Sequence, residues 1–88
     1  MKIKVEYLSK IQRECIKIFE NDDEDHPDGR RTSAAIKSII HWLNKITDNE
    51  YEQTIIWDIV DKYKFDKDWN ATYKALEAAG YEVEKNDI

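Results

Sequence analysis

Long apolar stripes of helical period are the feature that most constrains what this chain can fold into. Apolar residues recur at spacings of three and four through four stretches, near 8–19, 36–46, 51–63 and 69–79. Only two glycines and one proline interrupt the 88 residues, which is few for a turn-rich all-β fold. The pattern therefore predicts a mainly α (α+β minor) fold, a compact four-helix domain.

The first stretch carries two competing signals. Residues 2–7 alternate polar and apolar side chains, which predicts a short strand with Ile3 on its buried face. Ser9, with Gln12 as its capping-box partner, would then open a first helix from about 10 to 20. The alternative is a helix that begins near Ile3 and leaves no strand.

The second and third helices have clearer limits. Thr32 or Ser33 can cap the second helix, and the sequence from Thr47 to Glu50 predicts a capping box that opens a third helix over 51–63. The short connection between them predicts an antiparallel hairpin. The stripe of the second helix comprises Ile36, Ile39, Ile40, Leu43 and Ile46.

The last stretch predicts a short helix followed by a strand. Asp66 or Asp68 can cap this helix, and Gly80 stands where a left-handed residue would end it. Residues 81–84 then alternate as a strand, which we expect to pair with the N-terminal strand because neither is stable alone. The side chains expected in the core are Trp69, Tyr73, Leu76 and Ala79. With no internal repeat or linker, residues 1–88 form one predicted domain.

The composition argues against several classes of protein. A single cysteine, Cys15, allows no intramolecular disulfide, and its place on the apolar face of the first helix predicts a core residue. No apolar run reaches the roughly 18 residues that a membrane span needs. We therefore expect a cytoplasmic protein without membrane contact.

No motif for nucleotide binding, metal binding or nucleophilic catalysis occurs in the chain. We expect neither enzymatic activity nor a cofactor. Residues 20–28 contain six acids and no base, but a calcium loop aligned on Gly29 would place Ala35 at the position of the bidentate glutamate. A solvated acidic loop is therefore favoured over weak divalent binding by Asp22, Asp23, Asp25 and Asp28.

The net charge of −5 conceals blocks of opposite sign. Residues 29–46 carry four bases and no acid, whereas 47–61 carry five acids and no base. At about 100° per residue, the basic stripe of the second helix comprises Lys37, His41 and Lys45. The acids of the third helix that face away from its apolar stripe are Glu50, Asp58 and Asp61.

Trp57 falls among these acids, which makes it a candidate interface anchor, and Trp42 is offset from its own stripe to a lesser degree. The alternative for both is that neighbouring helices cover them. The first functional hypothesis is a non-enzymatic protein-binding module, an inhibitor or regulator that docks on a basic partner. DNA-mimicking inhibitors and small immunity proteins also present clustered carboxylates to a basic partner. The comparison rests on charge alone, because no motif of either group occurs in this sequence. The acidic loop would add Asp22, Asp23 and Asp25 to this face.

Two other functions stay open. Residues 55–83 can be interpreted as a helix-turn-helix with a short wing, which would offer Asn70, Thr72 and Lys74 to nucleic acid, although the acidic net charge argues against this. Homodimerisation that buries Trp57 and Trp42 is the third hypothesis.

Overall fold

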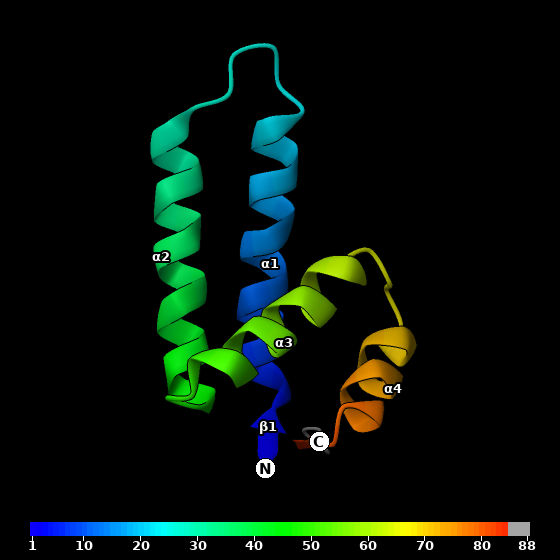
Figure 1. The fold of residues 1–88 in the computed structure, drawn as a ribbon. Coiled ribbons are helices and arrows are strands. Elements are labelled where there is room, and N and C mark those ends of the chain that lie inside the picture. Colours follow the sequence, from blue (N-terminus) through cyan, green and yellow to red (C-terminus); the bar gives the residue numbers. More distant parts are fainter. Residues whose placement is uncertain (85–88) are drawn as a thin grey trace.

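The mainly α, four-helix fold with paired terminal strands is confirmed in a computed structural model that describes residues 1–84 (Figure 1). The elements in chain order are β1 (Lys2–Lys4), α1 (Val5–Asp22), α2 (Gly29–Ile46), α3 (Glu50–Lys62), α4 (Asn70–Ala78) and β2 (Glu82–Glu84).

The two longest helices, α1 and α2, lie side by side and antiparallel (Figure 1). Helix α3 crosses α1 obliquely near the end where the chain begins, and α4 lies beside α3 (Figure 1). Because α3 crosses α1 instead of lying alongside α2, the expected antiparallel hairpin of the second and third helices is wrong (Figure 1). Because α1 and α2 have equal lengths of 18 residues, their apolar stripes can bury each other along most of both helices.

The terminal strands pair in parallel, with Ile3 opposite Val83. The predicted pairing is confirmed, but β1 ends at Lys4 and the helix begins at Val5, so Ser9 lies inside α1 rather than at its cap. Both interpretations of this segment were partly right. The helix begins before Ser9 for a physical reason. A start at Val5 places Leu8 on the same buried helix face as Cys15.

The α1–α2 connection is shorter than the acidic stretch suggested, because α1 continues to Asp22. Neither Thr32 nor Ser33 caps α2. The cap is Asp28, whose carboxylate accepts a hydrogen bond of 2.9 Å from the Arg30 amide. Here the acid at the end of the acidic run has a structural role.

Helix α3 is capped by Asn49, whose side-chain oxygen accepts from the amides of Tyr51 at 2.9 Å and Glu52 at 3.2 Å. The predicted capping box at Thr47 is therefore wrong. The Thr47 hydroxyl instead donates to the Glu52 carboxylate at 2.9 Å. Tyr51, expected in the apolar stripe, is 76% exposed.

Helix α4 begins after Trp69, a bulky residue with a left-handed backbone (φ 63°). The carboxylate of Asp66 accepts a 2.8 Å hydrogen bond from the Ala71 amide, so this residue caps the helix from outside it as predicted. Gly80 (φ 94°) ends α4, and the following Tyr81 amide donates to Leu76 at 2.9 Å. Ala79, expected in the core, is exposed.

The core gathers where α3 and α4 meet the α1–α2 pair. All three tryptophans are half-buried and pack against its edge. Its fully buried members include Ile3, Leu8, Ile11, Cys15, Ile39, Leu43, Ile56, Val60 and Leu76. No helix within residues 1–84 is long and apolar enough to cross a membrane.

Candidate functional site

The predicted acidic face of α3 is exposed to solvent. Glu50, Asp58 and Asp61 all lie on the surface. Asp61 forms an ion pair of 3.3 Å with Lys64, while neither Glu50 nor Asp58 forms an ion pair within residues 1–84. Two of these three carboxylates thus have no compensating cation on the part of the protein described.

Trp57 does not face away from the core as the sequence suggested. It is half-buried and packs against the core, which includes Cys15 of α1. Of the two interpretations of Trp57, the structure favours the one in which neighbouring helices cover it, because α3 crosses α1 where this side chain packs against the core (Figure 1).

Cys15 is a core thiol, as predicted. Burial above all, with a further contribution from the Asp61 carboxylate, raises its pKa to about 12. The thiol is therefore protonated at neutral pH and is a poor nucleophile.

The acids at the end of α1 form a second exposed group. Asp22 closes the last turn, and Asp23 and Asp25 follow in the connection at the end of the α1–α2 pair that lies away from the chain termini (Figure 1). Residues 1–84 contain no cluster of three or more histidine, cysteine or acidic side chains arranged to hold a metal.

An exposed aromatic pair brings together the two segments that carry the acidic groups. Phe19 of α1 and Phe65 of the α3–α4 connection lie with ring centroids 5.2 Å apart in an edge-to-face arrangement. The ammonium of Lys64 lies 5.3 Å from each ring centroid and is the same group that pairs with Asp61. One turn after Phe19, the Asp23 amide donates to the Phe19 carbonyl at 3.2 Å. Glu50, at the opposite end of α3, is not part of this arrangement.

The basic stripe of α2 is also exposed, at Lys37, His41 and Lys45. The structure adds Trp42, whose ring lies 5.9 Å from the ammonium groups of both Lys10 and Lys45. The rings of His41 at 5.1 Å and Tyr7 at 5.7 Å complete a mixed basic and aromatic surface.

The proposed helix-turn-helix is less well formed. Asn70 and Lys74 are exposed on α4, but Thr72 is buried and unavailable for contact. The strand β2 pairs in parallel with β1, so it is not the second strand of a hairpin wing.

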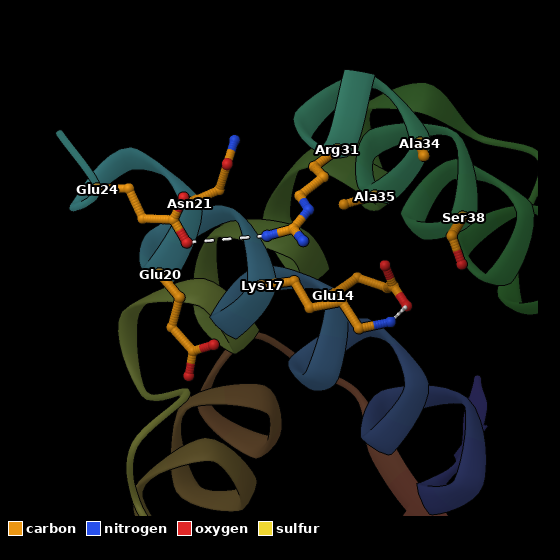
Figure 2. Close-up of a pocket in the computed structure, with 9 residues that line it drawn as sticks. All are labelled: Glu14, Lys17, Glu20, Asn21, Glu24, Arg31, Ala34, Ala35 and Ser38. Carbon is orange, nitrogen blue, oxygen red and sulfur yellow. Dashed lines mark hydrogen bonds and ion pairs between the residues drawn. The ribbon is translucent and has the colours of Figure 1, made fainter. Parts of the chain in front are cut away.

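A cleft of about 600 Å³ lies between α1 and α2. Figure 2 shows its charged rim, where Glu24 faces Arg31 at 3.7 Å and Glu14 pairs with Lys17 at 3.1 Å. The α2 side of the cleft is lined by small side chains, Ala34, Ala35 and Ser38. Because its rim charges largely pair with one another, this cleft offers no distinct chemistry.

No protein-family model matches the chain, and no curated protein or solved structure shows detectable similarity to it. The function must therefore be argued from the surface itself.

Sequence reasoning overlooked Phe65 and Asn21. Phe65 lies in the charged connection 63–69, and a phenylalanine between lysines and aspartates outside any helical stripe was the available signal. Asn21 carried no such signal, because its burial depends on how the connection folds back over it.

Proposed function

We propose that this protein is a non-enzymatic protein-binding module, an inhibitor or regulator that docks an acidic surface on a basic partner. The observation that carries the proposal is a set of exposed carboxylates without an ion-pair partner within residues 1–84. Exposed charges of one sign steer a partner of the opposite sign and raise its association rate. These carboxylates belong to Glu50 and Asp58 on α3, and to Asp22, Asp23 and Asp25 near the end of α1.

In this proposal Trp57 does not contact the partner but holds α3 on the core, against which its side chain packs. We place the activity in the cytoplasm, where a lone unpaired cysteine is ordinary. Homodimerisation through Trp57 and Trp42 receives less support, because both side chains are already half-buried in one copy.

Nucleic-acid binding is a second candidate, favoured by the basic and aromatic surface around Trp42. Proteins that bind single-stranded nucleic acid combine cationic side chains, which contact phosphates, with aromatic rings, on which the bases stack. In this hypothesis the contacts would come from Lys37, His41 and Lys45, with Asn70 and Lys74 as a separate group on α4.

One calorimetric experiment separates the two. Poly-L-lysine and a random DNA, single- or double-stranded, are titrated into the protein at low and high salt. The proposal expects poly-L-lysine to bind and Glu50→Lys with Asp58→Lys and Asp61→Lys to weaken it at least about tenfold, or about 1.4 kcal/mol.

The matched control reverses three exposed acids on other surfaces, Glu6→Lys, Glu77→Lys and Glu82→Lys, and so has the same net charge. We expect it to weaken binding less than about threefold. Equal losses in the two variants would show that only net charge matters and would refute a defined acidic face. Salt-dependent DNA binding that is lost on reversal of Lys37 and Lys45 would favour the second candidate.

A further inference from the structure

Phe19 and Phe65 are unusually exposed for aromatic residues that touch one another. Phe19 is 50% exposed and Phe65 is 58% exposed, yet their rings pack edge to face at 5.2 Å. They come from segments far apart in the chain, so their pairing is a product of the fold. A contiguous exposed aromatic surface on a small domain commonly marks an interaction site.

The pair is held in place from one side by Lys64. Its side chain is only 14% exposed, and its ammonium contacts both rings at 5.3 Å while pairing with Asp61 at 3.3 Å. The Lys64 carbonyl accepts a 2.9 Å hydrogen bond from the Gln12 side chain of α1. The connection that carries Phe65 is therefore held against α1, so binding a partner would lose little conformational entropy in this segment.

A hollow of about 340 Å³ adjoins Phe65, which is one of its lining residues. Trp69, which lines it, has a left-handed backbone (φ 63°), a conformation that costs a bulky residue about 1–2 kcal/mol. Its ring stacks on Tyr73 with centroids 5.9 Å apart. The lining residues are Gln12, Ile16, Lys64, Phe65, Lys67 and Trp69.

The charges around the pair decide what kind of partner fits. On the α1 side, the residues directly after Phe19 include Glu20, Asp22 and Asp23, all exposed and none in an ion pair within residues 1–84. On the other side Lys64 is neutralised by Asp61, which leaves Lys67 as the exposed cation in the lining of the hollow. The lining of the hollow itself contains two lysines and no carboxylate. Over residues 16–23 and 61–69, which carry the pair, the carboxylates without an ion pair in the described part of the chain (Glu20, Asp22, Asp23, Asp66 and Asp68) nevertheless outnumber the ammonium groups without one (Lys62 and Lys67).

We infer that the Phe19–Phe65 pair and the adjoining hollow anchor a partner segment that carries a large apolar side chain flanked by lysine or arginine. The apolar side chain would enter the hollow against Phe65, while the flanking cations would meet Asp22, Asp23 and Asp61. This inference rests on the proposed function. It assigns to Phe19 and Phe65 the role of apolar interface anchor, for which the sequence analysis had proposed Trp57.

The test uses two synthetic amphipathic helical peptides with the same leucine stripe, one carrying lysine and the other glutamate at the remaining positions. Calorimetry measures their affinities for the full chain, for Phe19→Ser with Phe65→Ser, and for Tyr51→Ser. Tyr51 is the matched control because it is 76% exposed on α3 and outside the pair. The lysine peptide should bind, the double phenylalanine variant should weaken it at least tenfold, and Tyr51→Ser should change it less than twofold.

Amide chemical-shift changes in the unmodified protein give a readout that does not depend on any variant. They should concentrate at residues 16–23 and 61–69. Changes confined to other surfaces would overturn the inference, as would equal affinity in the double phenylalanine variant. Tighter binding of the glutamate peptide than of the lysine peptide would indicate a site formed by Lys64 and Lys67 and would contradict the inference. A dimer of the unmodified protein that is lost in the double phenylalanine variant would also contradict it, because the pair would then bind a second copy of the chain.

Failure of this inference can be told apart from failure of the proposed function. If the lysine peptide ignores the double phenylalanine change but is lost on reversal of Asp58 and Asp61, the acidic face stands and only its anchor is wrong. If the unmodified protein binds neither poly-L-lysine nor the lysine peptide, both proposals fail.

Discussion

At the scale of single residues, Asn21 shows how one polar side chain can fasten a connection. It is 3% exposed, and its amide group donates at 2.8 Å to the Asp28 carbonyl and at 2.8 Å to the Thr32 hydroxyl. Its carbonyl accepts from the Asp28 amide at 3.0 Å. These bonds hold the acidic connection against the start of α2 and position the residue that caps it.

Replacing Asn21 with alanine should therefore destabilise the protein. Two backbone groups of Asp28 would lose their partner, so we expect Asn21→Ala to lower the free energy of unfolding by about 2–3 kcal/mol. Urea denaturation followed by circular dichroism measures the change. Asn70→Ala, at an exposed position of α4, is the control and should stay within about 0.5 kcal/mol. Equal effects would mean that the Asn21 bonds contribute little.

At the scale of elements, the two glycines have different roles. Gly80 has a φ of 94°, a conformation that a side chain disfavours, and ends α4 with a 3.0 Å hydrogen bond to the Glu77 carbonyl. Gly29 is the first residue of α2, and a Cβ atom added there would contact nothing within 4 Å. The same substitution should therefore act in opposite directions at the two positions.

We expect Gly80→Ala to lower the free energy of unfolding by about 1 kcal/mol, because alanine must adopt a left-handed backbone. Gly29→Ala should raise it by up to about 0.5 kcal/mol, because the unfolded chain loses freedom that the helix does not need. Thermal and urea denaturation of the two variants provide the comparison. A stabilising Gly80→Ala would contradict the role of this glycine in ending α4.

At the scale of the whole molecule, the parallel pairing of β1 with β2 brings the two ends of the described chain together. Ile3 on β1 is fully buried in the same core as Leu76 of α4. The first and last elements therefore share one core, and we predict that the chain unfolds as a single unit.

Ile3→Ala tests this prediction. Removal of a fully buried branched side chain should cost about 2–4 kcal/mol, whereas Lys2→Ala, at an exposed position of the same strand, should cost little. Far-ultraviolet circular dichroism and tryptophan fluorescence should give superimposable transitions in both variants. Separate transitions would show that the terminal strands open independently of the helices.

The sequence by itself determined the helices, the terminal strands and the segregation of charge. These follow from local rules: apolar residues such as Ile39 and Leu43 repeat with helical period, and Gly80 is placed where α4 must end. The observed caps of α2 and α3, Asp28 and Asn49, lie within about five residues of the predicted ones, because several residues near each helix start can accept a hydrogen bond from the first turn.

Only the tertiary structure decided which aromatic side chains are exposed. Helical periodicity gives the direction of a side chain relative to its own helix axis, but the crossing of α3 over α1 determines what lies in that direction. That crossing covers Trp57. The fold of the α3–α4 connection likewise leaves Phe65 in solvent beside Phe19, between acidic groups that lie far apart in the chain. The candidate binding surface is therefore a consequence of packing, which no local pattern in this sequence could specify.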